Sequence, residues 1–98
     1  MTSAAAVVAI GPIRSWAAEI RRVDKLSDRE YEVFVLLGNG DSNRQIAKRL
    51  CVTERTVKAH VAKVMAKLEV ESRLQAGLVA LTSLLLDESS LYGNRRAV

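Results

Sequence analysis

SNRQIAKRLCVTERTVKAHVAKVMAKL, residues 42–68, contains two helical patterns separated by a short turn. The second pattern begins at Thr53, which is a favourable N-cap residue. One anion, Glu54, lies in its first turn, and four cations follow it: Arg55, Lys58, Lys63 and Lys67. A helix of this kind can pack one face on a small core and lay the other in a DNA major groove. The stretch therefore predicts a helix pair whose second member contacts DNA.

The apolar spacing in residues 54–68 separates two faces of the second helix. Val57, Val61, Val64 and Leu68 recur at helical spacing and form the predicted buried stripe. The other side carries small alanines between long cations, so it can approach base edges closely while the cations reach phosphates. The alternative is a surface helix with surplus lysine. The preceding short helix, with Ile46, Ala47 and Leu50 inward, favours the DNA-contacting interpretation.

Three Ser-x-x-Glu/Gln sequences predict where helices begin. Ser27–Glu30, Ser42–Gln45 and Ser72–Gln75 each place a hydroxyl and a carboxyl or amide group at capping-box spacing. The first helix should end at Gly38-Asn39-Gly40, because these residues tolerate the left-handed cap conformation. The fourth should run from the Ser72 cap to about Leu86, and no segment alternates with a period of two. The sequence predicts a compact all-α bundle.

An extra amphipathic helix is predicted before this bundle. Ile13, Trp16, Ile20 and Val23 mark one face of a helix about ten residues long. Trp16 and Ile20 could pack on the domain that follows, or the helix could be a dimer contact or part of a linker. The predicted organisation is an N-terminal arm and helix (residues 1–24), a DNA-binding domain (25–86) and a flexible tail (87–98).

Composition narrows the classes of function. The 98 residues carry a net charge of +4, which is weak evidence by itself for a polyanionic partner. Cys51 is the one cysteine and His60 the one histidine, so no paired-cysteine metal site or catalytic constellation can be assembled, and we expect no cofactor. We expect His60 to be a core-edge residue with a local hydrogen bond. The sequence shows no membrane span, and we expect a non-enzymatic cytoplasmic protein.

Many residues at fixed offsets resemble the LuxR/FixJ-type helix-turn-helix domain, the output domain of many bacterial response regulators. The resemblance covers about residues 25–84. The matching positions are Leu26-Ser27, Arg29-Glu30, Glu32-Val33, Leu36-Leu37, Gly40, Ser42-Asn43, Ile46-Ala47, Leu50, Val52-Thr53, Thr56-Val57-Lys58, His60, Lys67-Leu68 and Ser72-Arg73. The resemblance implies a four-helix domain whose third helix reads the major groove and whose fourth helix dimerises.

The resemblance also assigns roles to individual positions. It implies that Lys58 contacts DNA near the groove, and that Asn43, Thr56 and Arg73 touch backbone phosphates. Thr56 and Arg73 lie in the first turn of a helix, where free amides favour an anion. Specificity would then rest on the neighbouring positions. The predicted DNA-contacting set is Asn43, Arg55, Thr56, Lys58, Ala59, Ala62, Lys63, Lys67 and Arg73.

Two features depart from the family pattern. Cys51 stands in the turn where the family usually has glycine, and a left-handed backbone there would cost roughly 1 kcal/mol. A redox role for Cys51 is the alternative to a tolerated small residue. The first 25 residues are also too few for a receiver or ligand-binding domain, so the regulating signal is open.

The last predicted helix is apolar on both sides, which indicates a partner. Leu74, Leu78, Leu81 and Leu85 form one stripe, and Ala76, Val79, Ala80 and Leu84 make the opposite side apolar. One core cannot cover both sides, so we expect a homodimer through the leucine stripe, with Gly77 allowing two helices to approach closely. The alternative is a monomer in which the helix of residues 13–23 covers the stripe.

These observations predict a sequence-specific transcriptional regulator that binds double-stranded DNA at two half-sites as a dimer. RNA polymerase is a further candidate partner, and a DNA regulator of this kind would be associated with the bacterial nucleoid. Two alternatives stay open: a protein-interaction module or antagonist that kept the fold and lost DNA binding, and a module like region four of sigma factors.

Overall fold

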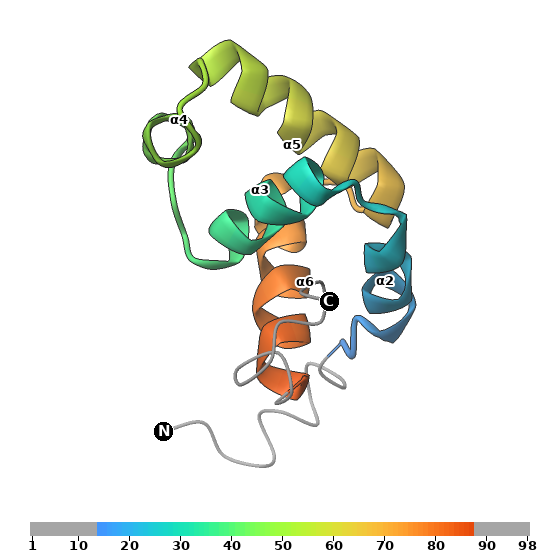
Figure 1. Cartoon of the computed structure of the whole chain (residues 1–98). Helices are drawn as coiled ribbons and strands as arrows, with labels where there is room; N and C mark the ends of the chain where they lie inside the picture. The colour runs from blue at the N-terminus through green and yellow to red at the C-terminus, as the bar shows by residue number, and fades with distance from the viewer. Residues whose placement is uncertain (1–13, 88–98) are drawn as a thin grey trace.

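The computed structural model describes residues 14–87, and this part of the chain is entirely helical (Figure 1). A short helix α2 (Ala17–Arg21) and a 3-10 turn η1 (Arg22–Lys25) precede four longer helices. These are α3 (Asp28–Gly38), α4 (Asn43–Leu50), α5 (Glu54–Leu68) and α6 (Arg73–Leu86). The predicted all-α class is confirmed. The predicted arm before residue 14 and the predicted flexible tail lie outside the described residues, save Asp87.

The capping residues act largely as the sequence predicts. Ser27 and Ser42 form complete capping boxes with Glu30 and Gln45. Thr53 caps α5 by accepting a hydrogen bond from the Thr56 amide at 3.1 Å. The third box differs from the prediction. The Ser72 hydroxyl does accept from the Gln75 amide, but the Gln75 side chain accepts from the Glu71 amide at 2.7 Å instead of the Ser72 amide.

The core lies where α3, α5 and α6 meet. Phe34 of α3, Ile46 of α4 and Leu68 of α5 are fully buried and belong to one apolar cluster. The four apolar residues of the α5 stripe are all buried, which confirms the predicted inner face. α4 packs mainly on α5, and α6 packs mainly on α3. In Figure 1, α4 and the start of α5 lie at one end of the molecule and α6 extends toward the other.

The close approach of α3 and α6 depends on two glycines. A Cβ on Gly38 would lie 2.7 Å from the Cβ of Ala80, and a Cβ on Gly77 would lie 3.0 Å from the Leu37 carbonyl oxygen. Gly77 therefore lets α6 pack closely on α3 within one chain. The prediction that Gly77 allows the helices of two subunits to approach is wrong, because this close contact lies inside the chain. The left-handed residue after α3 is Gly40, at φ 85°, whereas Gly38 and Asn39 are right-handed.

The N-terminal helix is shorter than the sequence pattern predicts. Trp16 takes a left-handed conformation at φ 60°, so α2 begins only at Ala17, and it tightens into η1 at Arg22. Trp16 and Ile20 pack against the core, which confirms the first of the two alternatives for them. Glu19 is buried and paired with Arg14. Ile13 lies outside the described residues.

Cys51 adopts the left-handed backbone at φ 56° and ψ 46°, with its side chain exposed. It ends α4, because the next amide, that of Val52, donates to the Ala47 carbonyl at 3.0 Å. A residue with a Cβ is strained in this conformation.

We expect Cys51→Gly to raise the free energy of unfolding by roughly 1 kcal/mol, because glycine relieves the strain of the left-handed backbone. Cys51→Ala is the matched control. It removes the thiol but keeps the Cβ, so its stability should stay close to that of the wild type. Urea unfolding followed by circular dichroism measures both. An equal gain from the two variants would mean that the thiol, and not the backbone, is the source of the effect.

Candidate nucleic-acid interface

The outer side of α5 is exposed along its length. Arg55, Lys58, Ala59, Ala62 and Lys63 are all exposed, opposite the buried valine stripe. Because α5 is capped by Thr53 and held by its apolar face, this outer side is fixed relative to the core. Long cations therefore flank a strip of small alanine side chains. Such a surface fits the width and charge of a major groove.

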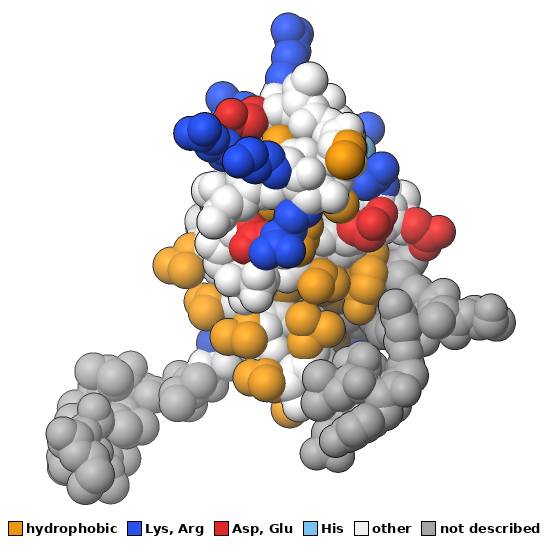
Figure 2. Space-filling model, turned by 60° about the vertical axis from the view of Figure 1, so that its left-hand side comes forward, with side chains coloured by type: hydrophobic (Ala, Val, Ile, Leu, Met, Phe, Trp, Pro, Cys, Tyr) orange, Lys and Arg blue, Asp and Glu red, His pale blue; other side chains and the backbone are white. Residues whose placement is uncertain are grey.

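Two cations of α4 add to this surface and were not singled out from the sequence. Arg44 and Lys48 are exposed on the side of α4 opposite the buried Ile46 and Ala47. Figure 2 shows lysine and arginine side chains gathered at the end of the molecule that α4 and the start of α5 form. The signal for these residues was the amphipathic pattern of α4, whose polar side is cationic. We call Arg44, Lys48, Arg55, Lys58 and Lys63 the basic face.

No ion pair neutralises the basic face within residues 14–87. Glu54 is the one acidic residue of α5, and it forms no ion pair within residues 14–87. A surface helix with ordinary solubility charges would more often pair opposite charges at i,i+4. The basic face therefore keeps its positive charge available to a polyanion.

The start of α5 has a hydrogen-bond donor left for a ligand. The Thr53 hydroxyl accepts from the Thr56 amide and lies 3.0 Å from the Thr56 hydroxyl. Since the Thr53 proton is directed to Thr56, the Thr56 hydroxyl can still donate outward. A hydroxyl at a helix N-terminus is suited to a phosphate oxygen.

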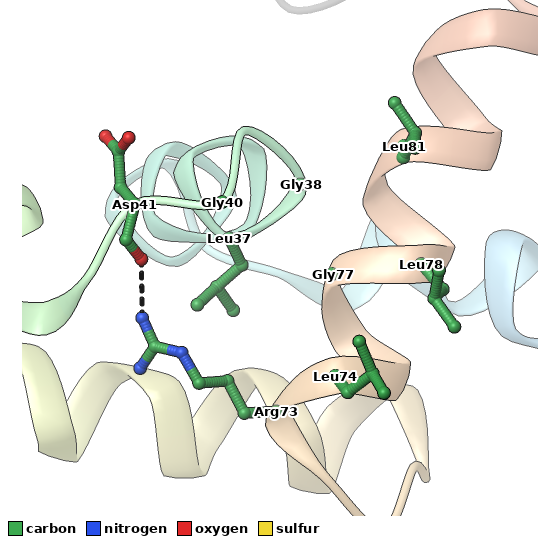
Figure 3. A pocket seen from close by; sticks show the side chains of 9 residues that line it. All are labelled: Leu37, Gly38, Gly40, Asp41, Arg73, Leu74, Gly77, Leu78 and Leu81. Carbon is green, nitrogen blue, oxygen red and sulfur yellow. Dashed lines mark hydrogen bonds between the residues drawn. The ribbon is translucent and has the colours of Figure 1, made fainter.

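Asn43 and Arg73, which lie far apart in the sequence, are brought together. The Arg73 guanidinium donates one hydrogen bond to the Asn43 side-chain oxygen and another, of 2.7 Å, to the Asp41 carbonyl oxygen. Both side chains are half-buried. Figure 3 shows the Arg73 side chain reaching from the start of α6 to the loop before α4. The two predicted phosphate-contacting residues thus also contact each other.

Lys67 does not stand free on the cationic side of α5. Its ammonium lies 2.6 Å from the carboxylate of Glu30, whose side chain is almost fully buried. The hydrogen bond from Lys67, and then that from the Ser27 amide, hold the pKa of Glu30 below its usual value. This pair therefore stabilises the fold above the ordinary carboxyl range near pH 4.3, and the stabilisation is lost as the pH falls through the lowered pKa.

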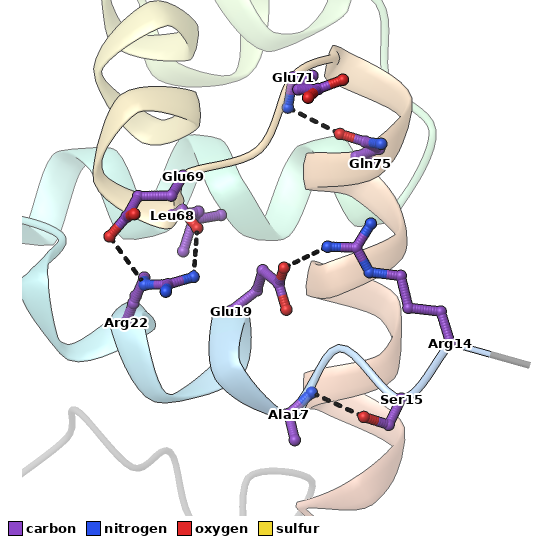
Figure 4. A network of polar contacts seen from close by, with 9 residues as sticks. All are labelled: Arg14, Ser15, Ala17, Glu19, Arg22, Leu68, Glu69, Glu71 and Gln75. Carbon is purple, nitrogen blue, oxygen red and sulfur yellow. Dashed lines mark hydrogen bonds and ion pairs between the residues drawn. The ribbon is translucent and has the colours of Figure 1, made fainter.

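A second polar network fixes the other end of α5 (Figure 4). The Arg22 side chain donates to the Leu68 carbonyl oxygen at 3.3 Å and lies 3.0 Å from the Glu69 carboxylate. Glu69 is left-handed at φ 60°, as Cys51 is after α4. The N-terminal segment thereby satisfies a carbonyl group at the end of the helix that bears most of the basic face.

His60 is half-buried at the edge of the core, as predicted, but its expected local hydrogen bond is missing. Its Nδ1 atom is buried and has no hydrogen-bond partner among the described residues. The same part of the chain contains no group of three or more metal-ligating side chains. None of its helices has the length and hydropathy that a bilayer crossing needs.

The outer side of α6 carries a leucine stripe that no described residue covers. Leu74 and Leu85 are 71% and 66% exposed, and Leu78 and Leu81 are also exposed, whereas Ala76, Val79 and Ala80 are fully buried. Ala76, Val79 and Ala80 thus form the core side of α6, whereas Leu84, which the sequence placed with them, is only half-buried. α2 contacts α6 but leaves the leucine stripe exposed. The alternative in which the N-terminal helix covers the stripe is therefore wrong. A shallow groove of about 360 Å³ lies beside the stripe, between α6 and the end of α3 (Figure 3).

Comparison with known proteins agrees with this arrangement. The family described as "Bacterial regulatory proteins, luxR family" (GerE) matches residues 24–80, more than half of the chain. The chain belongs to the luxR family. Its helix-turn-helix consists of α4, the turn at Cys51 and α5. The resemblance to the LuxR/FixJ-type domain that the sequence indicated is confirmed.

Curated relatives in the luxR family are longer proteins. The chain is 48% identical over 56 residues to the "Uncharacterized transcriptional regulatory protein YhcZ" of Bacillus subtilis, covering 57% of this chain and 26% of that protein. It is 42% identical over 57 residues to "Response regulator protein VraR" of Staphylococcus aureus and of Staphylococcus epidermidis, covering 58% of this chain and 27% of each. The chain thus matches about a quarter of the length of these relatives.

Proposed function

We propose that this chain is a sequence-specific DNA-binding regulator of transcription whose basic face enters the major groove. The observation that carries the proposal is the outer side of α5, where exposed alanines lie between Arg55, Lys58 and Lys63, three cations that form no ion pair within residues 14–87. Lys58 and Arg55 would reach the groove, Ala59 and Ala62 would allow close approach, and Lys63 would contact phosphate. Family membership and regulator relatives support the same function.

At the edge of the basic face, helix N-termini would hold the DNA backbone. Asn43 and Thr56 lie in the first turns of α4 and α5, where amides and side-chain donors suit phosphate oxygens. Arg73 lies beside Asn43. Lys67 contributes positive charge at the far end of α5, although its ammonium is shared with Glu30. These contacts would set the register of the protein on the duplex, while α5 would read the bases.

The functional unit would be a homodimer formed through Leu74, Leu78, Leu81 and Leu85. An exposed apolar stripe on a domain of this size favours burial against a partner, and a two-fold copy of the same stripe is the simplest partner. Two recognition helices would then reach successive major grooves, with half-sites about one DNA turn apart.

We assign residues 25–86 to this DNA-binding unit, residues 1–24 to an arm and residues 87–98 to a tail. We place the protein in the cytoplasm, associated with the nucleoid. RNA polymerase would be a further partner there.

A binding titration with fluorescently labelled duplex DNA tests the proposal against its main alternative. A DNA-binding regulator should bind random duplex at low salt and a selected operator more tightly. A protein-interaction module or antagonist that has lost DNA binding should bind neither. A module like sigma region four should need a polymerase core to bind its promoter element tightly, whereas this chain should bind an operator by itself.

A further inference from the structure

We propose that Arg73 is a positioning residue for DNA binding: it holds the start of α4 against α6 and orients the Asn43 amide toward a phosphate. The inference rests on the proposed DNA binding and concerns how the backbone contact is formed. It gives Arg73 an indirect role in place of a direct contact with phosphate.

The guanidinium bridges both sides of the α4 N-cap. One nitrogen donates to the Asp41 carbonyl oxygen at 2.7 Å, and the other donates to the Asn43 side-chain oxygen. Ser42, the N-cap itself, lies between these two acceptors in the sequence. The planar fork of an arginine suits two acceptors at once, and a lysine ammonium does not reproduce this geometry.

Asp41 extends the connection to the other end of α4. Its side chain is 8% exposed. One carboxylate oxygen accepts from the side-chain amide of Asn39 at 3.0 Å, and the other lies 2.8 Å from the Arg49 guanidinium in the last turn of α4. Since α4 packs mainly on α5 and α6 packs mainly on α3, apolar packing joins α4 and α6 only weakly. Arg73 and Asp41 therefore supply a polar connection between the first helix of the helix-turn-helix and the helix with the leucine stripe.

The hydrogen bond from Arg73 to Asn43 also determines which end of the Asn43 side-chain amide can bind a ligand. The side-chain oxygen of Asn43 is occupied by Arg73, and its Nδ2 group has no hydrogen-bond partner within residues 14–87. The amide nitrogen lies opposite the oxygen, so both of its N–H groups are left to donate. A phosphate oxygen accepts hydrogen bonds and never donates them at neutral pH. Arg73 thus presents the donor side of Asn43, at the N-terminus of α4, to an anion.

A cation in this place is otherwise unfavourable. Arg73 is the first residue of α6, where the helix dipole favours an anion. The two hydrogen bonds to the loop before α4 offset this cost. The same helix continues directly into Leu74, the first residue of the exposed stripe, so the connection joins the proposed dimer surface to the proposed phosphate contact.

The test compares Arg73→Lys, Arg73→Met, Asn43→Ala and the Asn43→Ala/Arg73→Met double variant in the DNA titration. We expect the two Arg73 variants and Asn43→Ala each to weaken binding about 10- to 100-fold, in line with the loss of one hydrogen bond to a charged group. The double variant should be little worse than either of its single variants, because Arg73 acts through Asn43. A direct phosphate contact predicts instead that Arg73→Lys binds normally and that the losses multiply, and either result would overturn the inference.

Hydrogen exchange in the free protein separates this inference from the proposed function. Arg73→Lys should speed the exchange of the Gln45 and Ile46 amides, which are bonded to Ser42 at the start of α4, by about 5-fold. Arg44→Lys changes an exposed arginine of the same helix that makes no contact with Arg73, and as the matched control it should leave the exchange of these two amides unchanged. Unchanged exchange in Arg73→Lys would refute the positioning role, whether or not the wild type binds DNA. Faster exchange together with a wild type that binds no DNA would refute the proposed function alone.

Discussion

Ala62→Glu is expected to abolish DNA binding and to leave the fold intact. Ala62 is exposed at the middle of the outer side of α5, within the basic face. A carboxylate there would face DNA phosphates, and the juxtaposition of like charges at an interface costs several kcal/mol. We expect at least about a 100-fold loss of affinity, with little change in thermal stability, because glutamate is a good helix former and Ala62 is exposed.

Ala62→Gln is the control for this variant, since glutamine has the same size as glutamate and no charge. It should lose far less affinity than Ala62→Glu, and the difference isolates the electrostatic part. Circular dichroism and a melting curve for both variants verify that the fold is kept. Normal affinity in Ala62→Glu would show that DNA, if bound, lies on another face of the molecule.

Leu78→Asp and Leu81→Asp are expected to dissociate the dimer. Both residues are exposed at the centre of the leucine stripe and face away from the core, so each change should spare the fold of the single chain. A buried charge at the centre of an apolar interface should cost about 2 kcal/mol or more, which weakens dimerisation at least about 30-fold. Binding to a two-half-site operator should fall, while binding to one half-site should persist.

Sedimentation equilibrium, with and without a two-half-site duplex, measures this effect. Leu86→Asp is the matched control: Leu86 is 72% exposed on the same helix but does not share the spacing of the stripe. Its mass and operator binding should match those of the wild type. The dimer proposal fails if the wild type stays monomeric on a two-half-site duplex, or if both stripe variants remain dimeric.

Local sequence signals predicted most of the fold. A hydroxyl at Ser27, Ser42 or Thr53 needs only the amides of the next turn as partners, so its role can be inferred from spacing of three residues. The apolar stripe of α5 was equally accessible, because helical periodicity is a property of the chain by itself. The exposed cations of α5 followed from the same periodicity.

The contacts that depend on distant segments were not predicted. Lys67 meets Glu30 across α3 and α5, and Arg73 meets Asn43 across α4 and α6, so spacing along the chain holds no sign of either pair. Gly77 was assigned to a subunit interface because nothing in the sequence shows that the Leu37 carbonyl lies against it. The N-terminal helix was predicted too long, since periodicity does not reveal that Trp16 leaves the helical conformation.

The salt dependence of DNA binding tests the central claim most directly. If the cations of the basic face contact phosphates, each contact releases counterions. The logarithm of affinity should then fall linearly with the logarithm of salt concentration, with a slope of roughly −0.9 per phosphate contacted. A dimer that presents the basic face twice should therefore bind duplex DNA tightly at low salt and lose most of its affinity as salt rises. A flat salt response, or no binding at low salt, would contradict the account.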